Sequence, residues 1–284
     1  MYNNEEMISV KEISKGIALA KNKLITLNKN DFINKKLSEV STYFLKKQGK
    51  LMRPGLVFFG VLYSGNKIDE FVDLAVSIEL LHTSSLIHDD LIDKDYKRRG
   101  INTTHVEFGN ELAILAGDAL ISKAIQNSAK YGKEVINYMS STAMKMSAGE
   151  VLDFEYQKLK KIPNLAEYIK ISELKSASLI ATSAAIAPYY KNSEAVKELE
   201  IFGLNFGLAF QIKDDFNDYI NENFNNDLER YRPNIISSLI NEGNSEEKSL
   251  DLAKQINKKY LGFAVNSLKK NSDNFLKYLK IAEI

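Results

Sequence analysis

Two similar acidic segments, HDDLID at 88–93 and KDDFND at 213–218, each end a long apolar stretch of the sequence. In both segments the first and last aspartates are four residues apart, so on a helix they lie on one face, one turn apart. Like charges at this spacing destabilise a bare helix, and the macrodipole disfavours anions at a helix C-terminus. Mg²⁺ typically takes one or two carboxylates together with waters and substrate phosphates. The repeated pattern therefore predicts a magnesium site in preference to two solvated acidic helix ends.

Basic side chains lie near the first acidic segment along the chain. Arginine binds phosphate oxygens bidentately, and lysine acts as a point charge. Each of these residues alone would be interpreted as a surface charge, but together with the acids they indicate a diphosphate site. His88 is interpreted as orienting Asp89 or capping the helix, and zinc is not expected because no histidines pair at helical spacing. The basic and polar candidates are Lys50, Arg53, His82, Arg98 and Arg99.

The composition excludes several other classes of protein. A formal net charge of +1 over 284 residues argues against bulk attraction to nucleic acid. The absence of cysteine rules out disulfides, thiolate metal sites and a cysteine nucleophile, and it is consistent with a reducing cytosol. No apolar run is long enough to span a bilayer, and no secretory signal is expected. We therefore predict a cytoplasmic protein that has no transmembrane segment and binds no nucleic acid.

Helical spacing of apolar residues dominates the sequence, whereas strand-like alternation is weak throughout. Because no proline- or serine-rich spacer interrupts it, residues 1–284 are predicted to form a single all-α domain. Residues 94–104 are predicted to form a loop, and residues 221–233 to be irregular. Helices are predicted over 6–25, 31–47, 53–64, 67–93, 108–131, 132–158, 164–187, 193–220 and 246–280.

Seven segments occur in an order and with gaps that resemble one known family, the trans-isoprenyl diphosphate (polyprenyl) synthases. They are GKLMRP at 49–54, HTSSLIHDDLID at 82–93, RRGINTTH at 98–105, FGNELAILAGDAL at 108–120, GEVLD at 149–153, LKSAS at 174–178 and GLAFQIKDDFND at 207–218. The resemblance implies the isoprenoid synthase fold, an antiparallel helix bundle around a deep central cavity, usually in a homodimer. It also implies a prenyltransferase of isoprenoid biosynthesis that joins isopentenyl diphosphate to an allylic prenyl diphosphate.

The resemblance implies roles for individual residues. Magnesium would be held by Asp89, Asp90 and Asp93 of the first segment, and from the opposite wall by Asp214, Asp215 and Asp218 of the second. Isopentenyl diphosphate would be bound by Lys50, Arg53, His82 and Arg99. The allylic substrate would be contacted by Arg98, Lys175, Ser176 and Gln211. Ser176 stands where the family commonly has threonine, and Glu150 where glutamine is frequent; both replacements are interpreted as mild.

The implied chemistry is electrostatic. Magnesium and basic side chains stabilise the leaving diphosphate as the allylic C–O bond ionises, and isopentenyl diphosphate then attacks the cation and loses a proton. No side-chain nucleophile is needed. After the second acidic segment the sequence departs from the family, because the expected glycine is missing and Arg230 or Arg232 replaces a lysine over 221–236. Arg232 is retained as a substrate-binding candidate.

Small residues before the first acidic segment suggest a long product. Ser84 and Ser85 stand where short-chain enzymes of the family place aromatic residues, and Leu81 and Ile78 lie further down the same helix. We therefore predict that the product exceeds farnesyl length, reaching geranylgeranyl or longer. Ile121 or Ile125 on the next helix would form the floor. The alternative is that the two serines are simply small packing residues, and both interpretations can hold.

Two other functions remain open. A class I terpene cyclase would share the first acidic segment, but it would not need Lys50, Arg53 and His82. A non-catalytic partner subunit of a prenyl synthase would fit the divergent segment 221–236. The intact acidic segments argue against the partner subunit.

Overall fold

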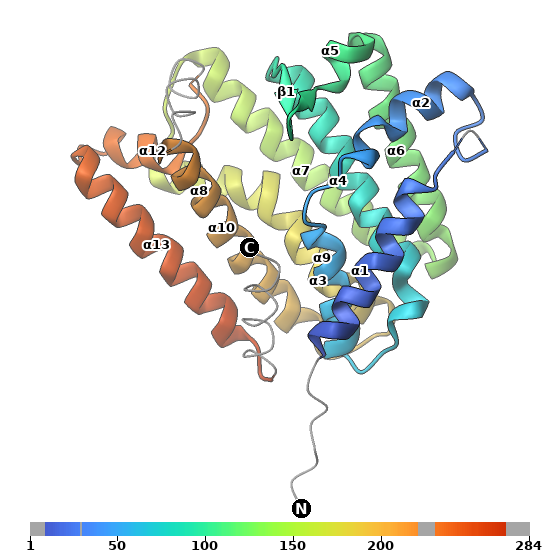
Figure 1. Cartoon of the computed structure of the whole chain (residues 1–284). Helices are drawn as coiled ribbons and strands as arrows, with labels where there is room; N and C mark the ends of the chain where they lie inside the picture. Colours follow the sequence, from blue (N-terminus) through green and yellow to red (C-terminus); the bar gives the residue numbers. More distant parts are fainter. Residues whose placement is uncertain (1–8, 29, 221–230, 271–284) are drawn as a thin grey trace, which may run out of the picture. The chain divides into compact units, whose positions relative to one another are not determined.

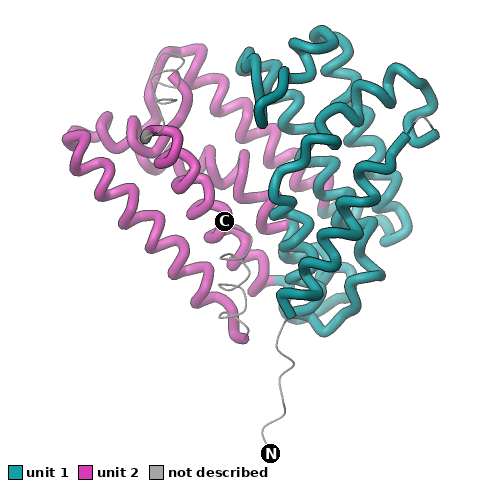
Figure 2. Tube along the Cα trace, viewed as in Figure 1, with its two compact units in different colours: residues 1–138, 183–196, 271–284 teal, residues 139–182, 197–270 magenta. Residues whose placement is uncertain are grey.

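The computed structural model describes residues 9–28, 30–220 and 231–270. The chain divides into two compact units, shown in teal and magenta in Figure 2. Unit 1 contains the described residues up to 138 together with 183–196. Unit 2 contains residues 139–182 and the described residues of 197–270. A single domain around a central cavity stays a prediction.

Unit 1 is built around helix α4, Val72–Ile92, which is apolar on nearly all sides. A helix that is apolar all round must be buried by its neighbours, and α4 packs against α1, α3 and α6 (Figure 1). The helices of this region are α1 (Val10–Ile25), α2 (Lys35–Tyr43), η1 (Phe44–Lys46), α3 (Met52–Tyr63), η2 (Ile68–Phe71), α5 (Thr104–Phe108), α6 (Asn110–Ser128) and η3 (Ala129–Tyr131).

Helices α4 and α6 approach closely where Gly117 faces His88. A Cβ atom at Gly117 would lie 2.1 Å from Nε2 of His88, so a larger residue would displace the His88 ring from its present position. The same His88 nitrogen lies 3.3 Å from the carbonyl oxygen of Ile114 on α6. His88 therefore contacts α6 near the acidic end of α4, and its interpretation as a residue that orients Asp89 or caps the helix stays a prediction.

The predicted loop at 94–104 contains a short β-hairpin. Strand β1, Lys97–Arg98, pairs antiparallel with β2, Ile101–Asn102. The two turn residues, Arg99 and Gly100, have φ angles of 52° and 78°, as a tight two-residue hairpin turn requires. Two-residue strands are too short to produce an alternating pattern, which is why the sequence did not reveal them.

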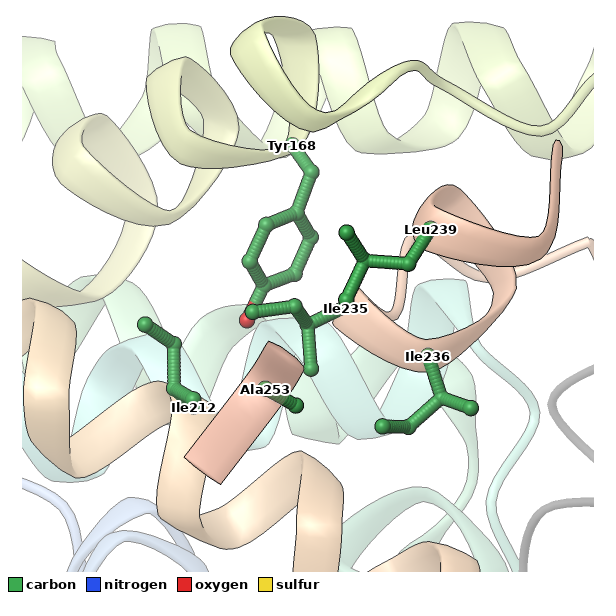
Figure 3. Close-up of a cluster of buried hydrophobic side chains, with 6 residues drawn as sticks. All are labelled: Tyr168, Ile212, Ile235, Ile236, Leu239 and Ala253. Atoms are coloured by element: carbon green, nitrogen blue, oxygen red, sulfur yellow. The ribbon is translucent and has the colours of Figure 1, made fainter. Parts of the chain in front are cut away.

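Unit 2 consists of long helices around a second apolar cluster. A hydrophobic core joins α8, α10, α12 and α13, and in Figure 3 the Tyr168 ring extends from α8 toward Ile212 and Ile235. Its elements are α8 (Leu165–Ser172), η4 (Glu173–Ala177), α10 (Val196–Ile220), α12 (Ile235–Asn241) and α13 (Glu246–Ser267). Two further helices, α7 (Lys133–Leu159) and α9 (Ser178–Tyr190), each have residues in both units.

Most predicted helices are present, but several differ in bounds or are divided. The helix predicted over 164–187 is divided by η4, a π-helical turn. The helix predicted over 108–131 begins at Asn110, because Gly109 has a φ angle of 93° and separates α5 from α6. The helix predicted over 246–280 ends at Ser267, and residues 271–284 lie outside the described residues. Among the described helices, none is both long and apolar enough to cross a lipid bilayer.

Candidate active site

The last turn of α4 presents two of the three aspartates of the first acidic segment. Asp89 and Asp93 are partly exposed, whereas Asp90 is fully buried. The backbone N–H of Asp93 donates to the carbonyl oxygen of Asp89 at 2.8 Å, which closes the final turn and keeps the two side chains one turn apart. Unit 1 therefore offers a pair of accessible carboxylates on one helix face, as the spacing predicted.

Asp90 is paired with an arginine of the β-hairpin. The Nε atom of Arg98 donates to Oδ1 of Asp90 at 2.5 Å. Burial raises the pKa of Asp90 to about 6, while Arg98 opposes the rise and the nearby Asp95 and Asp93 add to it. The ion pair thus joins the hairpin to α4. The sequence interpretation made Asp90 a metal ligand and did not include Arg98 as its partner.

The second hairpin arginine meets the segment before α3. Nη1 of Arg99 donates to the carbonyl oxygen of Lys47 at 3.1 Å. A Cβ atom at Gly49 would lie 3.0 Å from the other terminal nitrogen of Arg99, so the missing side chain leaves room for the guanidinium. The GKLMRP and RRG segments, separated in sequence, are therefore neighbours in unit 1. Lys50, within the first of them, is exposed.

Arg53, His82 and Glu79 form a group of ionisable side chains on α3 and α4. Nη1 of Arg53 donates to Nε2 of His82 at 2.9 Å. Burial and three nearby arginines, beginning with Arg53, lower the pKa of His82 well below its usual value, which favours the neutral ring. Because an arginine can only donate, Nε2 of His82 is the acceptor and the ring proton lies on Nδ1. Glu79 is 4% exposed, and burial raises its pKa to about 7 against the effect of Arg53 and Arg99.

In unit 2, Lys175 lies in the π-helical turn η4 and is held by α7. Its Nζ atom is 2.6 Å from Oδ2 of Asp153 and 2.7 Å from Oε2 of Glu150. The turn lies so close to α7 that a Cβ atom at Gly149 would be 2.4 Å from the backbone nitrogen of Lys175. Single π-helical turns within α-helices are frequent at functional sites.

A hydrogen-bond chain leads from η4 to the second acidic segment. Oγ of Ser176 donates to Oε1 of Gln211 at 2.8 Å, and Nε2 of Gln211 donates to Oδ1 of Asp215 at 2.8 Å. The other oxygen of Asp215 accepts from the backbone N–H of Ile235, at the start of α12, at 3.0 Å. Tyr168 is buried beside this carboxylate, and burial followed by Asp215 raises its pKa well above the usual value.

The remaining candidates of unit 2 differ in exposure. Asp214 is partly buried and Asp218 is exposed, and both lie in the last turns of α10. Arg232 is partly buried, and residues 221–230, which include Arg230, lie outside the described residues. The first acidic segment belongs to unit 1 and the second to unit 2. Their convergence on one diphosphate therefore stays a prediction.

The oxygen atoms of these carboxylates fit a magnesium ion whose coordination is completed by other ligands. Among the described residues, no group of three or more His, Cys, Asp or Glu side chains is arranged to hold a metal. Magnesium does not need such a cage, because it usually keeps several waters and one or two carboxylates beside substrate phosphates. Asp89 and Asp93 supply such a pair, and Oδ2 of Asp90 is buried without a hydrogen-bond partner in the described structure.

The predicted chain-length residues lie on α4, in the core of unit 1. Ser84 is 1% exposed, and its Oγ atom has no hydrogen-bond partner within the described part of the chain. Ser85 is partly buried and donates to the carbonyl oxygen of His82 at 2.9 Å. Leu81 is buried, whereas Ile125 on α6 is exposed. The assignment of these residues to a product tunnel stays a prediction.

Three residues that the sequence analysis did not select lie near the candidates. Glu79 and Asp153 are buried acids, and Tyr168 is a buried hydroxyl near Asp215. A charged residue within a stretch as apolar as that of Glu79 is a signal that could have been used, because such residues are rarely buried without a partner. Asp153 lies in the matching segment GEVLD. No comparable sequence signal distinguishes Tyr168.

Comparison with known proteins identifies the family. The model of the polyprenyl synthetase family matches residues 34–259. A short chain isoprenyl diphosphate synthase of Methanocaldococcus jannaschii is 33% identical over 66% of this chain and 59% of its own length. A geranylfarnesyl diphosphate synthase of Aeropyrum pernix is 36% identical over 63% of this chain and 60% of its own length. The matched region thus spans about three fifths of the length of these two curated relatives.

Solved structures agree in fold. A geranylgeranyl pyrophosphate synthetase of Geoglobus acetivorans matches with a TM-score of 0.82 at 23% identity, covering 95% of this chain and 98% of its own. An isoprenoid synthase family member of Thermotoga neapolitana matches with a TM-score of 0.80 at 27% identity, covering 94% and 99%. A polyprenyl synthase of Caulobacter crescentus, solved with calcium and isoprenyl diphosphate, matches with a TM-score of 0.72 at 22% identity, covering 96% and 91%.

These matches confirm the predicted all-α isoprenoid synthase fold. The family model extends from Asn34, at the start of α2, into α13, and so includes every described candidate residue. The chain belongs to the polyprenyl synthetase family.

Proposed function

We propose that the protein is a magnesium-dependent trans-prenyltransferase. It joins isopentenyl diphosphate to an allylic prenyl diphosphate, so that the allylic C–O bond breaks, a new C–C bond forms and a proton is lost. The products are a longer all-trans prenyl diphosphate and diphosphate. The supporting observation is the end of α4, where the accessible pair Asp89 and Asp93 lies in the same unit as the arginines Arg53, Arg98 and Arg99. Carboxylates with nearby guanidinium groups suit a metal-bound diphosphate.

In this proposal unit 1 binds both the metal and isopentenyl diphosphate. Asp89 and Asp93 hold Mg²⁺ against the allylic diphosphate, with Asp90 behind them. Bound Mg²⁺ supplies Lewis-acid stabilisation of the leaving diphosphate. The residues that bind isopentenyl diphosphate are Lys50, Arg53, His82 and Arg99. The neutral His82 ring accepts from Arg53 through Nε2, which leaves Nδ1–H to donate. The N-terminus of α3, next to Lys50, adds a favourable dipole for an anion.

Unit 2 holds the residues proposed for a further magnesium ion and for the allylic diphosphate. Asp214 and Asp218 hold a further magnesium ion, and Asp215 stands between them in the hydrogen-bond chain from η4. Lys175, Ser176 and Gln211 contact the allylic diphosphate together with Arg98, and Arg232 adds a charge from the segment before α12. Ser176 and Gln211 are hydrogen-bonded to each other, so their polar atoms are already oriented before substrate arrives.

We further propose a homodimer. Three apolar side chains of α7 are exposed at the spacing of one helix face: Met144 is 72%, Val151 57% and Phe154 46% exposed. Residues at such spacing form a continuous stripe along a helix. A second copy of the chain would cover this stripe and remove it from water. Light scattering after size exclusion tests this, and a monomeric mass at micromolar concentration would contradict it.

The proposed product is geranylgeranyl diphosphate or longer, made in the cytoplasm. Relatives named geranylfarnesyl and geranylgeranyl diphosphate synthases are 36% and 33% identical to this chain. The buried Ser84 and the partly buried Ser85 place no bulky side chain at their level of α4.

The decisive experiment is turnover by the purified chain alone. It is incubated with magnesium, labelled isopentenyl diphosphate and geranyl, farnesyl or geranylgeranyl diphosphate, and the dephosphorylated products are separated by chromatography. We expect all-trans alcohols longer than farnesol, and none after chelation of the metal. Cyclic hydrocarbons made from the allylic substrate alone would identify a terpene cyclase. No product from any primer, with activity appearing only beside another synthase, would identify a partner subunit.

A further inference from the structure

The ammonium group of Lys175 is shared by two carboxylates of the same helix. Oδ2 of Asp153 and Oε2 of Glu150, three residues apart on α7, lie 2.6 and 2.7 Å from it. All three side chains are largely buried, with 24% of Lys175, 13% of Glu150 and 10% of Asp153 exposed. At this burial the pairs are weakly screened by water and salt.

A lysine ammonium has three N–H donors; one donates to Asp153, and Glu150 lies at ion-pair distance from the same nitrogen. A diphosphate that binds Lys175 must therefore compete with both acids for the ammonium group. It must also approach the negative charge that both acids carry. One carboxylate is enough to orient the lysine, and the second adds repulsion.

We propose that Glu150 is a positioning residue that weakens the binding of the allylic diphosphate by holding Lys175. The inference rests on the proposed function, in which Lys175 contacts that diphosphate. A glutamine at this position would keep the size and one acceptor oxygen but lack the charge. The sequence alone suggested that glutamate in place of glutamine is a mild replacement. In this proposal the added negative charge weakens the binding of diphosphate by Lys175.

The test compares Glu150→Gln with a matched control. Glu155→Gln removes the same charge from an exposed position five residues further along α7. Binding of inorganic diphosphate in the presence of magnesium is measured by calorimetry for the wild type and both variants. We expect Glu150→Gln to bind about tenfold more tightly, which corresponds to ~1.4 kcal/mol. Glu155→Gln should bind like the wild type.

A kinetic measurement separates this role from a general structural effect. Glu150→Gln should lower KM for the allylic diphosphate and leave KM for isopentenyl diphosphate unchanged. Equal or weaker binding of diphosphate by Glu150→Gln would overturn the proposal. An equal gain in Glu155→Gln would also overturn it, because the effect would then be one of overall charge.

The failure of the proposed function is distinguishable from these outcomes. A wild-type chain that binds diphosphate but makes no prenyl product contradicts the prenyltransferase, while the comparison of the two variants still decides the role of Glu150. If neither the wild type nor Glu150→Gln binds diphosphate, Lys175 is not a diphosphate ligand and the inference is rejected.

Discussion

The acidic ends of α4 and α10 have similar sequences but different surroundings. In unit 1 the middle aspartate, Asp90, is paired with the charged Arg98, and burial raises its pKa to about 6. In unit 2 the equivalent Asp215 accepts from two neutral donors, the Gln211 amide and the backbone N–H of Ile235. The same motif thus joins α4 to a cationic hairpin in one unit and α10 to a helix N-terminus in the other. A shared spacing does not imply a shared electrostatic environment.

The largest expected effect concerns the first aspartate of each acidic segment, which the ends of α4 and α10 have in common. Asp89→Asn and Asp214→Asn should each lower kcat by roughly 10²–10³-fold, because each removes a carboxylate expected to hold magnesium where charge develops on the leaving group. Steady-state kinetics at saturating magnesium measures this. Asp251→Asn, at an exposed position of α13, is the control. A loss in only one of the two variants would show that the two ends are not functionally equivalent.

The second prediction tests the buried acids of unit 1 by pH. Glu79 has its folded-state pKa raised from 4.5 to about 7, so between these values the folded chain binds more protons than the unfolded chain. Stability therefore falls as pH rises through this window, by about 3 kcal/mol for this group. Glu79→Gln removes the titration.

Denaturant unfolding of the wild type and Glu79→Gln at pH 5 and pH 8 provides the measurement. The variant should gain stability relative to the wild type at the higher pH. Asp90 titrates in the same range in both proteins, so the difference between them isolates Glu79. A difference that does not change with pH would show that burial of Glu79 does not raise its pKa in the protein.

The third prediction separates the two middle aspartates. Asp215→Asn places an amide against the donors of Gln211 and Ile235, and we expect it to cost about 1–3 kcal/mol of stability. Asp90→Asn should cost less, because the raised pKa of Asp90 shows that its charged form is already disfavoured by burial.

Hydrogen exchange locates the effect of these two variants. The amides at the start of α12, including that of Ile235, should exchange faster in Asp215→Asn and at the wild-type rate in Asp90→Asn. Equal losses of stability in the two variants would show that Asp90 and Asp215 do not differ in this way. Unchanged protection of α12 in Asp215→Asn would show the same.

The smallest expected effect concerns product length. Ser84→Phe adds a ring at a buried position of α4 and should shorten the product, with a modest loss of stability from overpacking. Chromatography of the dephosphorylated product measures the length. Ser122→Phe, at an exposed position of α6, should leave it unchanged. A folded Ser84→Phe enzyme with the wild-type product would show that Ser84 does not line the tunnel.

The sequence predicted much of the fold because most of its helices are long and their apolar residues recur at helical spacing. It missed the hairpin at Lys97–Asn102, whose strands are too short to alternate, and the π-helical turn at Glu173–Ala177, which is too short for its spacing to be distinguished from that of an α-helix. The motifs also selected the candidate residues, since residue type and order along the chain are properties of the sequence.

Partnerships between side chains were decided by the tertiary structure alone. The sequence determined that Asp89 and Asp93 share a helix face, because that follows from 3.6 residues per turn. It could not determine that Arg98 pairs with Asp90, that Asp215 accepts from Ile235, or that Glu150 reaches Lys175. These contacts join residues from different elements, and their burial and charge depend on packing that no local spacing specifies.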